Sequence, residues 1–435
     1  MVILYRFVLT LLVAACAVLP AAVSARDLGL AEAEQLVARG NRDVLAARRG
    51  IEAAGAGILQ ADVRPNPVVS YNAASISSNP GIGGGSFYNK HFDNIFRIDQ
   101  LIERGNKREL RVEAAKGMER VATNDAGEIL RQQLLLTRNS YVDLQQAQGK
   151  VEILAGLSEL FSRTYSAAQT RLKAGDLASA DVARVQVDFE RAQNDFRVAQ
   201  AELARAQFAL AYLVADEVAA PALRASDPWP PAIVPDLAEI QRAITQYVES
   251  RPDVLSAKAK IEATEKLRDL ARSQRTRDVT VGAQFERFPG NLPTNSVGFG
   301  VSIPLLVGND FSGDIRRAEV DHYAALDALV KVRAVAITEI SRAASDLRAA
   351  TERRARYDGS LLAAAQRSAA AAEFAFQRGA TSVLEVLDAR RTLRAVELEG
   401  LTARADYAKA LYAWTASLQS AQVLVPGAAV PAPPN

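Results

Sequence analysis

The chain is poor in the residues that build metal sites and reactive centres. Its 435 residues include two histidines, two methionines and one cysteine. A zinc or copper site needs several such ligands close together, so the sequence predicts no resident metal. His91 and His322 are far apart, and we interpret each as a loop or helix-surface residue rather than a ligand. With no Gly-rich phosphate loop and no nucleophile–base set, nothing favours an enzyme or a cofactor.

Neither sign of charge is in excess. The 52 Lys and Arg residues nearly balance 50 Asp and Glu residues. Because a nucleic-acid-binding surface needs a basic excess, the composition argues against a nucleic-acid partner.

Long apolar runs are missing after the N-terminus. Arg6, an apolar run over 7–19, Pro20 and the small residues "VSA" ending at Ala25 predict a secretory signal peptide over 1–25. The run is short for a transmembrane anchor, and no later run approaches about 18 residues. A second interpretation is that "VAAC" over 13–16 is a lipobox, which would make Cys16 the acylated first residue. We favour cleavage after Ala25.

The chain contains an internal repeat. "DVLAARRGIEAA" at 43–54 recurs as "DVLSAKAKIEAT" at 253–264, and "RLKAGDLASADV" at 171–182 is echoed by "AFQRGATSVLEV" at 375–386. The predicted organisation is a first structural repeat over 26–220, a Pro-rich linker over 221–235, a second repeat over 236–420 and a flexible tail over 421–435.

Proline is absent from two long windows, between Pro80 and Pro221 and between Pro304 and Pro426. Proline breaks helices, so these windows can hold very long ones, interrupted at Gly175 and Gly379. Each repeat is predicted to contain a helix, two strands, a long helix, a glycine turn and another long helix. A helix over about 104–173 would be roughly 100 Å long.

The helices after the two glycines carry a heptad seam, which is typical of left-handed coiled-coil packing. The first seam is Val185, Phe189, Ala192, Phe196, Ala199, Leu203, Ala206, Leu210 and Leu213. The second is Ala389, Leu393, Val396, Gly400, Ala403, Tyr407, Ala410 and Trp414.

Four segments alternate apolar and polar residues with the period of a strand. They span 67–75, 92–100, 279–285 and 296–304. Each has about the length of an outer-membrane barrel strand, although a soluble sheet with one wet face alternates in the same way. The secretion signal and the long helices favour the membrane. Four strands cannot close a barrel, and lipid does not tolerate open edges, so several chains must share one.

The chain resembles the TolC outer-membrane efflux family. The resemblance rests on the repeat, "VRPNPVVS" at 63–70, "FGVSIPLL" at 299–306, and the turns "AGDLASADV" at 174–182 and "RGATSVLEVLDA" at 378–389. It implies a mainly α fold with a membrane β-barrel. The implied homotrimer shares a 12-stranded barrel, four strands per chain, and a long periplasmic coiled-coil tunnel.

The resemblance also implies a passive duct in the cell outer membrane that extends into the periplasm. Its partners would be outer-membrane lipid, a periplasmic adaptor and an inner-membrane pump of the resistance-nodulation-division type. "DQLIERGNKREL" at 99–110 resembles the cobalt–zinc–cadmium branch but departs from its usual pattern. Heavy-metal cations and organic compounds therefore both stay open as substrates.

Three acids are candidates for a pore gate: Asp181, Glu385 and Asp388. The resemblance implies that acids at these positions ring the pore at the closed periplasmic end. Asp181 and Glu385 also fall four residues before the first seam positions, where a coiled coil wants an apolar side chain. Helix capping is the alternative for Glu385, because Ser382-x-x-Glu385 is a capping box. Asp388 lies one turn further in, where no capping role applies.

The glycine turns are candidates for adaptor docking. Gly175 and Gly379 are expected to be helix C-caps, and the resemblance implies that the same turns are gripped by the adaptor. Phe376 and Thr381 stand where well-known members have an aromatic hydroxyl and an arginine that latch the closed end, so the latch is expected to differ.

An alternative function is a periplasmic coiled-coil scaffold or adaptor without a membrane barrel. Such a protein would be extracted without detergent, whereas a duct would not.

Overall fold

The computed structural model describes residues 26–76, 92–233, 237–288 and 294–420. The predicted signal peptide, Cys16, His91 and the tail over 421–435 lie outside the described residues. The chain divides into two compact units. One comprises Met1–Ala46, Ile129–Val248 and Ala336–Asn435, and the other Ala47–Glu128 and Glu249–Val335. Each unit draws on both halves of the sequence, and the repeat boundaries stay a prediction.

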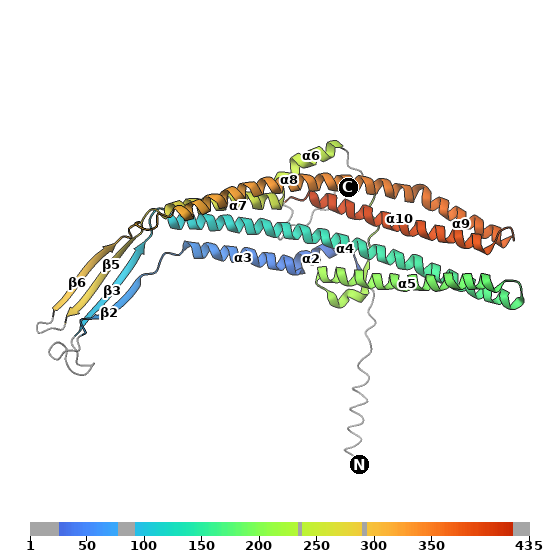
Figure 1. Ribbon diagram of the computed structural model, residues 1–435, viewed down its shortest axis with the longest axis horizontal. Helices are drawn as coiled ribbons and strands as arrows, with labels where there is room; N and C mark the ends of the chain where they lie inside the picture. The colour runs from blue at the N-terminus through green and yellow to red at the C-terminus, as the bar shows by residue number, and fades with distance from the viewer. Residues whose placement is uncertain (1–25, 77–91, 234–236, 289–293, 421–435) are drawn as a thin grey trace, which may run out of the picture. The chain divides into compact units, whose positions relative to one another are not determined.

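The proline-free windows form the longest helices (Figure 1). In the first, α4 spans Lys107–Ala174 and α5 spans Ser179–Val214. Helix α4 begins at residue 107 rather than 104 because Gly105 and Asn106 have φ angles of 75° and 56°, which no right-handed helix contains. Among the described residues, no helix is long and apolar enough to cross a membrane.

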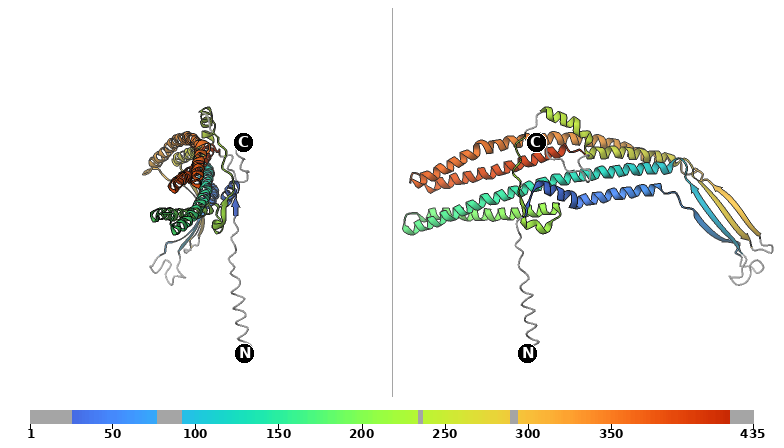
Figure 2. Two further views of the ribbon diagram at one scale, coloured as in Figure 1. Left: turned by 90° about the vertical axis from the view of Figure 1, so that its right-hand side faces the viewer. Right: turned by 180° about the vertical axis from the view of Figure 1, so that it is seen from behind.

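The second window differs from the prediction of one long helix before Gly379. Helix α8 spans Ser312–Arg356, a π-helical turn follows at Tyr357–Leu361, and α9 spans Leu362–Gln377. Helix α10 then covers Val383–Ser417. Figure 2 shows α4 alongside α5 and α9 alongside α10, so each pair is a helical hairpin. Periodicity did not reveal the π turn, because one extra residue in a turn hardly disturbs an Ala-rich pattern.

The four predicted strands are confirmed and form one antiparallel sheet. They are β2 (Val68–Ala74), β3 (Asp93–Ile102), β5 (Val279–Phe288) and β6 (Thr294–Ser302), in the order β2-β3-β5-β6. The register aligns Tyr71, Phe96, Phe285 and Val297 across one face. This face is apolar and exposed; Phe299, for example, is 85% exposed.

Shorter elements complete the two units. They are β1 (Arg26–Leu28), α2 (Leu30–Gly40), α3 (Arg42–Asp62), β4 (Leu223–Ala225), α6 (Leu237–Tyr247), α7 (Pro252–Ser273) and 3-10 turns at Glu217–Ala222 and Val248–Ser250. Strands β1 and β4 pair in parallel, which the sequence did not indicate. The buried Tyr141 holds them: its hydroxyl donates to Leu28 O at 2.9 Å and accepts from Ser226 N at 3.0 Å.

The heptad seam of α5 is buried or half-buried at every predicted position. Val185, Ala192, Ala199 and Leu210 are all buried. Along α10, Ala403, Tyr407 and Trp414 are buried in the same way. Both seams are therefore packing faces within the chain.

Candidate gate at the helical hairpin tips

Both glycine turns are Schellman motifs. Gly175 has φ of 81° and Gly379 has φ of 74°. After α4, Gly175 N donates to Leu172 O at 3.1 Å and Asp176 N to Arg171 O at 2.9 Å. After α9, Gly379 N donates to Phe376 O and Ala380 N to Ala375 O, both at 2.9 Å. The expected helix C-caps are confirmed in both repeats.

Helix α10 begins with a side-chain cap. Ser382 Oγ accepts a hydrogen bond from Glu385 N at 3.4 Å. The Glu385 carboxylate accepts a hydrogen bond from the Thr381 hydroxyl, so it is tied to the turn that precedes the helix. Glu385 is exposed and lies in the first helical turn, where a negative charge favours the helix dipole. Its carboxylate therefore has a local structural role, whatever further role it has.

Asp181 and Asp388 are also exposed but differ in their partners. Asp181 lies 3.7 Å from Arg184 on its own helix, in an ion pair that is open to water. Within the described residues Asp388 makes no hydrogen bond or ion pair. Asp388 is thus the candidate gate residue with no local structural explanation.

An apolar cluster brings the starts of α5 and α10 together. Leu387, between the acids of α10, is buried among Phe161, Ala168, Val182, Val185 and Ala192. Val182 adjoins Asp181, and Leu387 adjoins Asp388. The first turns of the two helices therefore pack against each other, with their acids exposed beside this contact.

Sequence reasoning missed two charge pairs that join α5 to α10. Both Asp188 carboxylate oxygens accept from Arg391 Nη2 at 2.6 Å, and the Asp188 side chain is only 7% exposed. Asp195 accepts from Arg394 Nη2 at 2.5 Å. Asp181, Asp188 and Asp195 recur at heptad spacing, and this spacing was the available signal.

The pairs stop before the tip. Further along α5 and α10, each aspartate of the heptad series faces an arginine of the other helix. At the first turns α10 carries Glu385 and Asp388, and within the described residues no ion pair joins Asp181, Glu385 or Asp388 to an arginine of the other helix. Asp181 is paired with Arg184 on its own helix, so Asp388 is the acid of the tip without a charged partner among the described residues.

Two residues, Phe376 and Thr381, stand where the latch residues of well-known family members are expected. Both make other contacts here. Thr381 donates to Glu385 as described above. The Arg171 guanidinium lies 5.8 Å from the centre of the Phe376 ring, which links α4 to α9 by a cation–π contact. The hairpins are thus joined at the tip by an apolar cluster and a cation–π contact.

His322 lies on α8, and Thr264 Oγ1 is 3.2 Å from its Nδ1. Over the residues that the structure describes, no group of three or more His, Cys, Asp or Glu side chains comes together in a way that could hold a metal ion.

Comparisons with known proteins give one consistent picture. Residues 243–418 match the family model "Outer membrane efflux protein". The cobalt-zinc-cadmium resistance protein CzcC of Cupriavidus metallidurans is 25% identical over 375 residues, 85% of each chain. A membrane protein from Pseudomonas aeruginosa has a TM-score of 0.74 at 17% identity, over 90% of this chain and 93% of its own. The CmeC outer membrane channel of Campylobacter jejuni has a TM-score of 0.74 at 16% identity, over 89% and 85%. The structural matches show that the fold is shared.

Proposed function

We propose that the chain, whose residues 243–418 match the outer membrane efflux protein family model, is the outer-membrane channel of a tripartite efflux system. In this role it is a passive duct, which receives its substrate from an inner-membrane pump and a periplasmic adaptor. The sheet is the observation that carries the proposal. One of its faces is apolar and exposed, and side chains such as Phe299 require a covering that lipid supplies.

Three chains would share one barrel. The sheet has four strands and two open edges, β2 and β6. Pairing of β6 with β2 of the next chain removes every edge, and three chains then give twelve strands. The long helices would continue as a tunnel built from the same three chains.

The assembly is tested by extraction and light scattering. The protein should require detergent, run as a species of three chains, and form conducting channels in planar bilayers. A protein that is extracted without detergent as a monomer would instead support a periplasmic scaffold.

We propose heavy-metal cations as the cargo. CzcC is named for cobalt, zinc and cadmium resistance, and the acids Glu385 and Asp388 are exposed at the start of α10. Cells that lack the protein should lose tolerance to cobalt, zinc or cadmium. Full tolerance to all three, with lost tolerance to organic compounds, would contradict this cargo.

The pore gate is assigned to Asp181, Glu385 and Asp388. In a trimer these acids would form rings around the axis, and acid rings attract cations and repel anions. Divalent cations should block the wild-type channel from the periplasmic side, and Asp388→Asn should weaken the block. Glu385→Gln also disturbs the start of α10, so Asp388→Asn is the cleaner variant. Unchanged block in a folded Asp388→Asn trimer would remove Asp388 from the gate.

The glycine turns are proposed as the adaptor contact. A Cβ atom at Gly175 or Gly379 would meet no atom within 4 Å, so the turns are open to a partner. Cysteine cross-linking from Asp176 and Ala380 should capture the adaptor in cells. Capture from α3 positions such as Leu59, but not from the turns, would place the docking surface elsewhere.

The predicted signal peptide would direct the chain out of the cytoplasm, which an outer-membrane location requires. The intact mass of the purified chain decides between its two processing routes. Cleavage after Ala25 gives an unmodified mature chain, whereas the lipobox route gives a chain that begins at acylated Cys16.

A further inference from the structure

The acidic side chains of the sheet all lie on one face. The register places Asp93, Asp99 and Glu286 on the face opposite Phe96 and Phe285. Arg97 shares this polar face, while Arg287 is on the apolar face. The strands of the polar face thus carry three acids and one arginine per chain, whereas those of the apolar face carry no acid.

Arg97 and Asp99 form a direct ion pair on β3. Arg97 Nε donates to Asp99 Oδ1 at 2.9 Å and to Oδ2 at 2.7 Å. The side chains are 38% and 24% exposed. Opposite charges at this distance largely cancel for an ion that passes further away.

Glycines on the neighbouring strands make room for this pair. Asp99 lies opposite Gly282, which lies opposite Gly300. A Cβ atom at Gly282 would lie 2.2 Å from Asp99 Oδ1, which no structure tolerates without movement, whereas a Cβ at Gly300 would lie 3.7 Å from Arg97 Nη2. The pair therefore lies flat against the sheet because residue 282 has no side chain.

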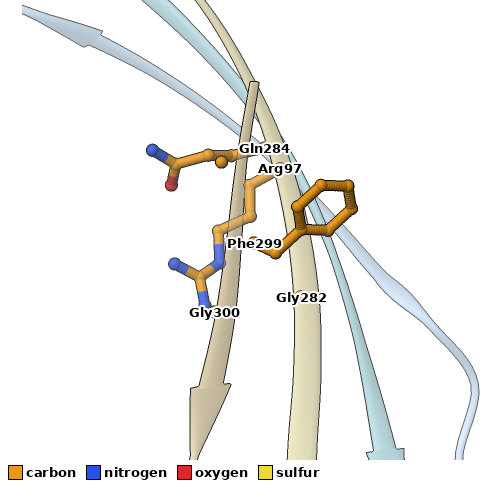
Figure 3. Close-up of a pocket in the computed structure, with 6 residues that line it drawn as sticks. Arg97, Gly282, Gln284, Phe299 and Gly300 are labelled. Carbon is orange, nitrogen blue, oxygen red and sulfur yellow. The ribbon is translucent and has the colours of Figure 1, made fainter. Parts of the chain in front are cut away.

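The same glycines form the floor of a small hollow, of about 160 Å³, lined by Arg97, Gly282, Gln284, Gly298, Phe299 and Gly300. In Figure 3 the Arg97 guanidinium ends beside Gly300, and the Phe299 ring extends away from it. Arg97 thus rests along the wall instead of projecting from it.

Glu286 is different, because its side chain makes no hydrogen bond or ion pair within the described residues. It faces the same side as Arg97 and lies opposite Ile95 and Ser296, neither of which carries a charge. Its carboxylate therefore has no ion-pair partner among the described residues, although Arg97 is its diagonal neighbour on the same face. Asp93, the third acid, is buried and accepts a hydrogen bond from Ser75 Oγ at 2.6 Å.

We propose that Glu286 is a charge-selecting residue of the barrel lumen. We also propose that the Arg97–Asp99 ion pair has little effect on ion selectivity, because Gly282 leaves the space in which the two side chains contact each other. The inference rests on the proposed function, since the polar face lines the lumen only in a shared barrel. Three copies would then place three Glu286 carboxylates around the lumen. Cation preference would thus arise in the barrel as well as at the acidic helical tip.

The test is the reversal potential of the purified trimer in planar bilayers under a KCl gradient. A lumen charge acts over about one Debye length, ~10 Å at 0.1 M salt, so we expect changes of about twofold in the cation-to-anion permeability ratio. Glu286→Gln should lower the ratio. Arg97→Gln should raise it by freeing Asp99, and Asp99→Asn should lower it by freeing Arg97. The double variant Arg97→Gln/Asp99→Asn should match the wild type, and all differences should shrink in 1 M salt.

The two glycines supply a matched control. Gly282→Ala forces Asp99 away from Arg97 and should change the ratio, while Gly300→Ala should leave it unchanged. An unchanged ratio in Glu286→Gln, or a changed ratio in the double variant, would overturn the inference. These measurements require conducting trimers. Failure of the wild-type protein to form channels would instead overturn the proposed function, so the two failures are distinguishable.

Discussion

The two tip hairpins follow the same chain path but are stabilised differently. The apolar cluster of the first hairpin, α4 with α5, contains Phe161, Val182 and Val185, and the Tyr165 and Phe189 rings stack at 5.4 Å. The second hairpin, α9 with α10, is Ala-rich and adds only Leu387 to that cluster. The first hairpin therefore supplies most of the large apolar side chains of this cluster, whereas the second buries alanines such as Ala365 and Ala369 and joins α9 to α10 by the Glu373–Arg390 ion pair.

The second hairpin also begins at a break in its helix. At the π turn, Asp358 accepts from Arg404 Nε at 2.9 Å and Arg354 Nε at 3.1 Å, and Tyr357 Oη donates to Glu399 at 3.0 Å. Helix α4 has no such interruption. The two repeats thus differ in the continuity of the helix that leads to the tip.

The largest difference in stability loss between the hairpins should appear when a buried side chain is removed from each of them. Phe161→Ala removes a ring that is 4% exposed and should cost about 3 to 5 kcal/mol of stability. Ala369→Gly in α9 should cost only about 1 kcal/mol, through helix propensity. Hydrogen exchange at the hairpin tips, followed by mass spectrometry, measures the stability loss of each variant. Equal losses would show that the second hairpin has a comparable core.

The charge pairs test the contacts between the two hairpins. Arg391→Met leaves the buried Asp188 carboxylate without its partner and should cost about 2 kcal/mol. Arg394→Met removes a more exposed pair, in which Asp195 is 43% exposed, and should cost about 0.5 kcal/mol. Thermal unfolding followed by circular dichroism compares them. A second change, Asp188→Leu, should recover most of the Arg391→Met loss.

The glycine turns should show no difference between the hairpins. Both residues have positive φ and open surroundings. Gly175→Ala and Gly379→Ala should therefore cost about 1 kcal/mol each, from backbone strain alone. The same unfolding experiment applies. Unequal costs would mean that one turn is already strained by its neighbours.

The smallest effect concerns pH. Burial raises the pKa of Glu397 on α10, and Arg390 opposes this only in part. The folded chain therefore keeps its proton at a pH where the unfolded chain has released it. Stability should fall as pH rises from the usual Glu pKa to the raised one. In Glu397→Gln, the slope of stability against pH in this window should be smaller than in wild type. An equal slope would assign the pH dependence to other groups.

Local patterns made the elements predictable. Alternation over 279–285 and 296–304 predicted β5 and β6, and the heptad at Val185 and Ala192 predicted a buried seam. Predicted ends differed by a few residues where a backbone conformation intervened, as at Asn106. Such patterns work because one element's own residues determine which of its faces is apolar.

The candidate site was only partly predictable. The cap at Ser382 was visible as a motif, because its partners are three residues apart. The Asp188–Arg391 pair joins residues 203 positions apart, so the heptad recurrence of the aspartates could mark Asp188 but not its partner. Arg171 and Phe376 meet for the same non-local reason.

The sequence alone determined the long helices, the glycine turns, the strands and the family resemblance, since these depend on composition and short-range order. Only the tertiary structure decided which charges are compensated. Among the described residues Asp188 is paired and Asp388 is not, and Arg97 is paired with Asp99 while Glu286 has no ion-pair partner. The physical reason is that charge compensation depends on the distance between side chains of different elements, or on the space that a glycine of another strand leaves. Packing sets both.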